Sequence, residues 1–535
     1  GLAPDTTYFY RFRVGEIFSP VGTTKTLPEG AVDRVKLAVF SCSNYAAGYF
    51  HAYAEAAKRN DLDAVVHLGD YIYEYGRTTL DENGQTIPAY ASEDAAQLGR
   101  QVEPAHEILS LADYRTRYAQ YRGDEDLQAL HAKLPFICVW DDHEVANDTW
   151  QDGAENHDPA TEGSFATRQQ AAIQAYAEWM PIRPVIQDGM LELARSFQWG
   201  DLVNLSMLDT RVIARSKQID IKAFLPFSAE QQQAFMAAMA DPTRTLLGKT
   251  QRDWLFEEFK KPATWHVLGQ QILMGRMYLP AAVATQQMSV GDYAELGALA
   301  QLAQLAQLAG RAEAGDPTLT AAELQFLQAN IQRLTPENLQ FLQENVQRLT
   351  PEKMAQLRLP NIPYNLDAWD GYEVERRLVL AEAVKNKVKL VVLAGDTHNA
   401  WANQLGLPLM AEGSATNIDI TDALAMANIG VEFATPSVSS PGLEEYLKLD
   451  TPQKVLEAEF GVPQLVGGLK YTNLSDRGFM LVTFDTEKVS AEWVFVSSIK
   501  QKTYGVMAER GKTLSASVMP ANPDVPNCFG QLTFC

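Results

Sequence analysis

The chain has 535 residues, a formal net charge of −22, 46% hydrophobic residues and 21% charged residues. This composition is ordinary for a soluble globular protein, and no apolar run reaches the roughly 20 residues that span a bilayer. Because a surface that binds nucleic-acid phosphates must be basic, we expect no nucleic acid as a stable partner. A small anionic substrate is compatible with the acidic chain if bound metal ions supply local positive charge.

The first 28 residues predict the end of a small β-sandwich domain. The stretch "TYFYRFRV" alternates apolar and polar side chains, as strands with one buried face do. We expect residues 1–28 to be the C-terminal part of that domain. Its earlier strands and any signal peptide would then lie upstream of Gly1, outside this numbering.

After Pro28, apolar strands alternate with helices, which predicts an α/β fold. We expect a mixed, two-sheet core flanked by helices over residues 29–500, followed by a tail over 501–535. Helices are predicted at 48–60 and 163–180. Strands are predicted at 35–42, 62–70, 134–144, 200–211, 264–274, 389–398, 430–437, 477–485 and 490–498.

Residues 290–358 predict a folded helical insertion. The stretch "ALAQLAQLAQLAG" has a three-residue period, which drifts round a helix and does not form one apolar stripe. A fifteen-residue unit, "LQFLQANIQRLTPEN", then repeats as "LQFLQENVQRLTPEK". Helix starts are predicted at Thr335 and Thr350, each followed by proline, and at Thr320, which can form a capping box with Glu323. A surface decoration, a lid and a partner surface are the alternative roles.

The four cysteines divide into two pairs. Cys42 and Cys138 lie in or beside apolar strands, whereas Cys528 and Cys535 lie in the Pro- and Gly-containing tail. A disulfide between the tail cysteines would imply an oxidising compartment. Their spacing alone leaves both states open.

Metal-competent side chains follow four of the predicted strands. The densest run is "VWDDHEVANDTW", residues 139–150, whose crowded carboxylates need solvent, an arginine or a metal ion to offset their repulsion. The other three positions are Cys42, Asp70 with Tyr73, and Asp396 with His398.

Each of these side chains also has a purely structural interpretation, as a buried thiol, a helix cap, a packed ring or a core histidine. Together they predict a site, because strand carboxyl ends in α/β proteins meet at one edge of the sheet. Thiolate, phenolate and imidazole suit a trivalent or borderline transition metal, whereas carboxylate and amide oxygens suit calcium or magnesium. Glycines before Asp70 and Asp396 are expected to let the backbone approach an ion closely.

Several motifs occur together in one order: "FSCSN", "HLGDYIYEYG", "VWDDHEVAND", "FATRQQAAIQAYAEWMPIRP", "LDTR", "AWDGYEVERR" and "VVLAGDTHNAW". In these motifs the chain resembles the PhoD-type alkaline phosphatases and phosphodiesterases of the calcineurin-like metallophosphoesterase superfamily. The resemblance covers about residues 1–500, outside the helical insertion. It implies a four-layer αββα sandwich, Fe³⁺ and Ca²⁺ as cofactors, and an extracytoplasmic location, periplasmic or secreted.

The resemblance also implies a set of ligands. The implied iron ligands are Cys42, Asp70, Tyr73 and His398. Asp70 would bridge to calcium, and the implied calcium ligands are Asp396 and one or more of Asp142, Asn147 and Asp148. The family usually has paired asparagines after its DDHE, whereas this sequence has Asn147 and Asp148, so the choice among the three candidates stays open.

The implied activity is hydrolysis of small phosphoric esters, monoesters or diesters, by a metal-bound oxygen nucleophile. His143 is the candidate acid near the scissile bond, and its alternative role is to orient a neighbouring group. Arg168, on the predicted helix, is the candidate phosphate ligand or else an ion-pairing arginine, and Arg211 is expected to be structural. The rival functions are a phospholipase D-like phosphodiesterase and a metal-binding module without turnover. The sequence does not set the oligomeric state.

Overall fold

The computed structural model describes residues 1–535 except 82, 188–189, 226–228, 286, 409–425, 518–532 and 535. Cys528 and Cys535 lie outside the described residues, so their pairing stays a prediction. The chain forms two compact units. The larger unit contains residues 1–276, 365–450 and 467–535, and the smaller unit contains residues 277–364 and 451–466.

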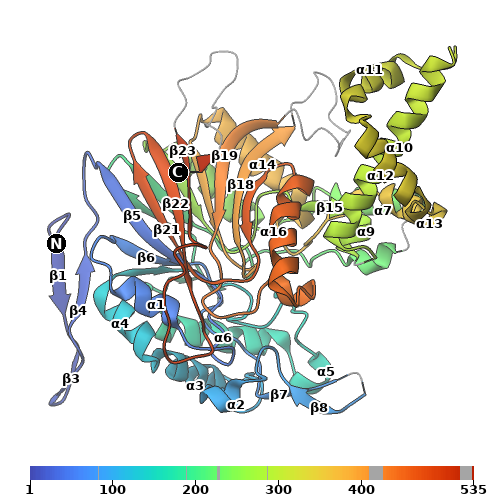
Figure 1. Ribbon diagram of the computed structural model, residues 1–535. Helices are drawn as coiled ribbons and strands as arrows, with labels where there is room; N and C mark the ends of the chain where they lie inside the picture. Colours follow the sequence, from blue (N-terminus) through green and yellow to red (C-terminus); the bar gives the residue numbers. More distant parts are fainter. Residues whose placement is uncertain are drawn as a thin grey trace. The chain divides into compact units, whose positions relative to one another are not determined.

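The larger unit contains two mixed sheets, each with seven described strands (Figure 1). The first sheet has the order β24-β23-β22-β21-β5-β6-β9. Its strands are β5 (Arg34–Phe40), β6 (Ala64–His67), β9 (Phe136–Cys138), β21 (Arg477–Asp485), β22 (Lys488–Val496), β23 (Lys512–Ser517) and β24 (Thr533–Phe534). Strands β5, β6 and β9 are parallel to one another, and the remaining neighbours pair antiparallel.

The second sheet has the order β12-β13-β14-β17-β19-β18-β20. Its strands are β12 (Arg195–Trp199), β13 (Val203–Met207), β14 (Trp265–Gly269), β17 (Leu390–Ala394), β18 (Ala400–Pro408), β19 (Met426–Ala434) and β20 (Leu469–Asn473). Strands β13, β14, β17 and β19 run parallel. All nine predicted strands are confirmed. Several predicted ranges run past the observed strand ends, because the residues just beyond them form loops that carry polar side chains.

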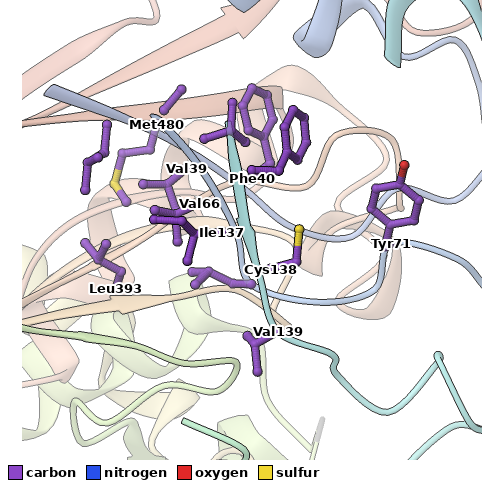
Figure 2. Packing of buried hydrophobic residues seen from close by; sticks show 14 of the residues in the cluster. Val39, Phe40, Val66, Tyr71, Ile137, Cys138, Val139, Leu393 and Met480 are labelled. Atoms are coloured by element: carbon purple, nitrogen blue, oxygen red, sulfur yellow. The ribbon is translucent and has the colours of Figure 1, made fainter. Parts of the chain in front are cut away.

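One hydrophobic cluster joins the two sheets (Figure 2). Val39, Val66 and Met480 from the first sheet and Leu393 from the second all belong to it and are fully buried. Strands covered on both faces carry nearly continuous apolar runs, which explains the sequence pattern of β5, β6 and β17. Truncating one such side chain typically costs about 2–5 kcal/mol.

Helices accompany both sheets. Figure 1 shows α1 (His51–Ala57), α3 (Leu111–Arg122), α4 (Glu125–Lys133) and α6 (Phe165–Trp179) grouped beside the first sheet. Helices α8 (Gly248–Glu258) and α14 (Glu373–Lys385) contact strands of the second sheet. A second cluster that includes Leu255, Val379 and Val392 fills that contact. The predicted helices at 48–60 and 163–180 correspond to α1 and α6.

Most of the remaining elements of the larger unit are short. They are β7 (Thr78–Leu80), β8 (Thr86–Pro88), α2 (Ala95–Leu98), α5 (Pro159–Glu162), β10 (Ile186–Gln187), β11 (Met190–Leu191), η1 (Ile221–Phe224), α7 (Ala229–Met239), η4 (Trp369–Tyr372) and α15 (Leu443–Tyr446). Residues 1–28 form two small antiparallel pairs: β1 (Thr7–Tyr10) with β4 (Gly22–Lys25), and β2 (Arg13–Val14) with β3 (Ile17–Phe18). Their membership of a β-sandwich domain stays a prediction.

The smaller unit is mainly helical. Its elements are β15 (Tyr278–Pro280), α9 (Ala281–Ala284), α10 (Val290–Glu313), α11 (Ala321–Asn330), η2 (Ile331–Arg333), α12 (Pro336–Asn345), η3 (Val346–Arg348), α13 (Pro351–Leu357), β16 (Asn361–Pro363) and α16 (Pro452–Leu465). The predicted N-caps at Thr335 and Thr350 are confirmed, as is the capping box of Thr320 with Glu323. The lid and partner-surface hypotheses stay predictions. Among the described helices of the whole chain, none is long and apolar enough to cross a membrane.

The leucines of α10 are buried on more than one side of the helix. Their three-residue period predicted no single apolar stripe, yet Leu296, Leu299, Leu302, Leu305 and Leu308 are all buried. Leucines three residues apart do turn progressively round a helix. They are buried all the same because α10 contacts α11, α12, α13 and α16, and so is covered on more than one side.

Candidate metal centre

The loops after β5, β6, β9 and β17 bring the predicted ligands together. Cys42, Asp70 and His398 offer ligand atoms that lie within 4.8 Å of one another. The same limit holds for Asp70, Asp142 and His143, and for Asp141, Asp142 and Asp396. Because Asp70 belongs to two of these groups and Asp142 also belongs to two, the three groups form one continuous cluster.

Left-handed backbone conformations concentrate in this cluster. Nine non-glycine residues in the described chain have positive φ, and five of them are predicted metal ligands. These five are Cys42 (φ 63°), Asp70 (52°), Asp148 (52°), Asp396 (64°) and His398 (62°). Such conformations are uncommon for residues with a side chain and gather at ligand-binding sites. They turn the chain sharply after each strand and so aim the side chains at a shared point.

The two glycines before the aspartates allow close packing of the chain, and the expectation that they let the backbone approach an ion stays a prediction. A Cβ on Gly69, which has a φ of +105°, would lie 2.3 Å from the backbone nitrogen of Asp141. A Cβ on Gly395 would lie 2.2 Å from Oγ of Ser41. Both distances are shorter than real Cβ contacts, so a side chain at either position would force its neighbour to shift. The glycines therefore allow the ligand loops to touch one another.

Asp70 has an oxygen that lacks a protein partner. The Tyr73 hydroxyl donates to Asp70 Oδ2 at 3.0 Å and accepts from Ser440 Oγ at 2.6 Å. Asp70 Oδ1 is buried and has no hydrogen-bond partner among the described residues. A buried, unsatisfied carboxylate oxygen is costly, and a cation would satisfy it.

The thiol and the phenol beside Asp70 need a cation to become anionic ligands. Burial, together with the charge of Asp70, raises the pKa values of the Cys42 thiol and the Tyr73 phenol well above their usual ranges. A bound metal ion reverses this effect, because it stabilises thiolate and phenolate directly. The donor set of thiolate, phenolate, imidazole and carboxylate therefore fits a transition-metal ion.

His398 is held in the orientation of a metal ligand. Its Nδ1 lies 2.6 Å from the carbonyl oxygen of Pro441, and since a carbonyl only accepts, Nδ1 carries the proton. Burial lowers the pKa of His398 to about 3, so the ring is neutral and Nε2 keeps its lone pair. Nε2 lies 3.3 Å from the Tyr73 hydroxyl, inside the cluster. A backbone carbonyl that fixes the far nitrogen is the usual companion of a metal-binding histidine.

At least three of the four carboxylates in the 141–148 run already have protein partners, namely Asp141, Asp142 and Glu144. The Arg211 guanidinium is fully buried and forms an ion pair with Asp141. It also donates to Asp367 and to Asp396, both at 2.7 Å. Glu144 accepts from the backbone N–H groups of Asp70 at 3.1 Å and Asp141 at 2.7 Å. The crowding is thus offset in part by an arginine, as its expected structural role implied, and in part by the backbone.

Glu74, which was not among the residues predicted for the site, holds His143. Glu74 Oε2 lies 2.6 Å from His143 Nδ1, and Glu74 Oε1 accepts from the backbone N–H of Asn147 and from Asn156 Nδ2, both at 2.8 Å. Burial opposes the charged imidazole, but the charges of Glu74 and Asp142 outweigh burial and raise the pKa of His143. The available signal was an isolated acidic residue inside the aromatic run "YIYEYG".

Comparisons with known proteins agree with this geometry. A family model described as PhoD-like phosphatase matches residues 37–493. The chain belongs to this family. It is 31% identical over 463 residues to alkaline phosphatase D of Bacillus subtilis (strain 168), which covers 85% of this chain and 60% of that relative. A solved structure titled "Structure of PhoD" matches with a TM-score of 0.64 and 26% identity, over 97% of this chain and 76% of that chain. The chain therefore spans about 60% of the length of its curated relative.

Three candidate calcium ligands in this PhoD-like chain have different surroundings. Asp142 accepts from the backbone N–H groups of His143 at 3.0 Å and Asp148 at 2.6 Å, and it lies in two of the ligand groups. Burial, with the charges of Asp367 and Asp142, raises the pKa of Asp148 to about 7, so Asp148 lies among other carboxylates. The Asn147 amide donates to Glu155 at 2.9 Å. The surroundings of Asp142 fit a ligand best.

Arg168 lies in an ion-pair network, which is the alternative role considered for it. Its Nη2 donates to Glu107 at 2.7 Å, and its Nη1 to the Asn156 carbonyl at 2.9 Å. Its Nε donates to the Tyr114 hydroxyl at 3.2 Å, and that hydroxyl in turn donates to the Val145 carbonyl. The guanidinium is buried. These contacts favour a structural role that supports the 141–148 loop over the predicted phosphate contact.

Proposed function

We propose that this PhoD-like chain is a metal-dependent hydrolase of small phosphoric esters, acting on monoesters, diesters or both. The observation that carries the proposal is the convergence of Cys42, Asp70 and His398, which follow β5 and β6 of the first sheet and β17 of the second, around a buried carboxylate oxygen that has no hydrogen-bond partner among the described residues. Family membership and the identity to alkaline phosphatase D support it. The activity remains a proposal because the chain spans 60% of that relative.

The proposed cofactors are Fe³⁺ and Ca²⁺. The residues that would hold Fe³⁺ are Cys42, Asp70, Tyr73 and His398. The residues that would hold Ca²⁺ are Asp70, Asp396 and one or more of Asp142, Asn147 and Asp148. The hard oxygen donors suit calcium, and the mixed sulfur, nitrogen and oxygen donors suit iron. Such a centre, when loaded, supplies an activated water and neutralises the charge on phosphate oxygens.

The protein's own groups would act around that centre. Glu74 holds Nδ1 of His143, which leaves Nε2 to donate a proton to a phosphoryl oxygen or to the leaving oxygen. Arg211 forms ion pairs with Asp141 and Asp396 and so reduces the repulsion between these two buried carboxylates. A phosphate contact by Arg168 would require its pairing with Glu107 to break. We therefore assign Arg168 a positioning role.

We also propose the four-layer αββα arrangement and the extracytoplasmic location that the resemblance implied. The shared core of the two sheets, together with the helices that contact each sheet, supports the layers. The location rests on the resemblance alone. We further propose that residues 29–500 form the catalytic domain and that the helical insertion lies within it.

A panel of phosphomonoesters and phosphodiesters, assayed on protein whose iron and calcium have been counted, tests the function. We expect turnover that follows metal content. Turnover of phosphodiesters alone, with a preference for phospholipids, would favour a phospholipase D-like enzyme. Bound metals without any phosphate or alcohol release would mean a metal-binding module and would overturn the proposal.

A further inference from the structure

Three tyrosines without an assigned role lie beside the metal centre. Tyr75 follows the Asp70 loop, Tyr90 follows the β7–β8 hairpin, and Tyr446 ends α15. Their burial decreases outward, because Tyr75 and Tyr90 are half-buried whereas Tyr446 is 54% exposed. The three residues therefore extend from the edge of the centre to the protein surface.

Tyr90 contacts both other tyrosines, and Tyr75 and Tyr90 each contact one histidine of the site. The Tyr75 ring centroid lies 5.5 Å from that of Tyr90 and 5.4 Å from that of His143. The Tyr90 hydroxyl lies 3.5 Å from Nδ1 of His398 and 3.4 Å from the hydroxyl of Tyr446. We call Tyr75, Tyr90 and Tyr446 the aromatic wall.

The wall lies on the side of the site where a leaving group would emerge. Because Nε2 of His143 is the donor proposed to reach the leaving oxygen, an organic group attached to that oxygen would lie near Tyr75, whose ring is adjacent to the His143 ring. This step rests on the proposed function. Tyr90 and Tyr446 then continue the same surface outward.

The charges around the site also favour a neutral group. Arg211 is paired with Asp141 and Asp396, and Arg215 with Asp367. These buried cations are therefore engaged with carboxylates and do not present a second anion-binding position. A leaving group that carries further phosphates would meet carboxylates, whereas a flat, uncharged ring would meet aromatic faces.

We propose that the aromatic wall is a specificity determinant that stacks on a planar organic group of the ester, so that aryl-type phosphoric esters are preferred over compact alkyl esters. Aromatic pairs prefer offset or edge-to-face contacts with centroids about 4.5–7 Å apart, and the loss of one such contact changes affinity by about 2- to 10-fold.

Binding of two non-hydrolysable probes, phenylphosphonate and methylphosphonate, to the metal-loaded protein tests the wall. The parent protein should bind phenylphosphonate more tightly. In Tyr75→Ala and in Tyr446→Ala the ratio of the two affinities should fall by about 2- to 10-fold. In Tyr75→Phe and Tyr446→Phe, which keep the rings, the ratio should stay near the parent value. Circular dichroism checks the fold, and the exposed position of Tyr446 keeps the test valid if Tyr75→Ala fails to fold.

Two outcomes separate this inference from the proposed function. If ester hydrolysis is present but the parent binds both phosphonates equally, or if neither alanine variant changes the ratio, the wall has no role in specificity. If neither phosphonate binds and no ester is hydrolysed, the proposed function and the wall fail together.

Discussion

Replacing Glu74 with glutamine tests the role of His143 as a proton donor. Glu74 is fully buried, and its Oε2 lies 2.6 Å from His143 Nδ1. Glutamine keeps the length and shape of the side chain but removes the negative charge that favours the imidazolium. The variant should therefore fold and retain its metals, while His143 loses its proton at a lower pH than in the parent.

The size of the expected pKa shift of His143 follows from its interaction with the charge of Glu74. Two unit charges about 4 Å apart interact by about 4 kcal/mol at an effective dielectric constant near 20. At about 1.4 kcal/mol per pKa unit, this is an upper bound of roughly 3 units. Because Glu74 helps to raise the pKa of His143, the protonated donor persists to higher pH in the parent. Without the charge of Glu74, the loss of activity at alkaline pH should therefore begin at a lower pH.

The assay is the dependence of kcat/KM on pH with an aryl phosphate ester. For Glu74→Gln we expect the alkaline limb to move down by about 2–3 pH units and activity above that limb to fall about 100-fold. Glu107→Gln is the matched control, because the hydrogen bonds of Glu107 go to Arg168 and Asn156 and not to His143. An alkaline limb that stays in place in Glu74→Gln, or that moves equally in Glu107→Gln, would refute the reasoning.

Three further predictions concern the same region. His143→Ala should keep its iron and calcium, measured by elemental analysis, but lose turnover by about 100-fold or more; loss of metal would make His143 a ligand. Chelation should abolish activity and added calcium should restore it, and activity indifferent to chelation would contradict the calcium assignment. Arg211→Met should lower the free energy of unfolding in urea by about 3–5 kcal/mol because it leaves buried carboxylates unpaired. Arg115→Met, which removes an exposed ion pair with Glu178, should cost about 1 kcal/mol or less, and an equal cost in the two variants would contradict the buried network.

The sequence was sufficient to predict the strands and the clustering of several candidate ligands. Apolar runs marked β5, β6, β9 and β17, since strands covered on both faces carry continuous hydrophobic stretches. The polar residues after β5, β6 and β9 lie at one edge of the first sheet because these strands are parallel, and the loop after β17 adds residues from the second sheet. Cys42, Asp70 and His398 therefore lie close together, as expected. His398 does so although hundreds of residues separate it from the other two in the sequence.

The contacts that organise the site could not be predicted in the same way. The pairing of Arg211 with Asp141 and Asp367 joins segments 70 and 156 residues apart, and no periodicity encodes such contacts. The hydrogen bond between Glu74 and His143 depends on the conformation of the chain after β6, which local propensity does not specify. The ion pair of Arg168 could not be predicted for the same reason, because its partner Glu107 lies in a loop without a pattern.

The central claim is that Cys42, Asp70, Tyr73 and His398 hold ferric iron. The most direct measurement is the iron content of the purified protein together with its visible absorption spectrum. The account predicts about one iron per chain and a phenolate-to-iron charge-transfer band that shifts or disappears in Tyr73→Phe. A colourless, fully active preparation without iron, or a band unchanged in Tyr73→Phe, would contradict it.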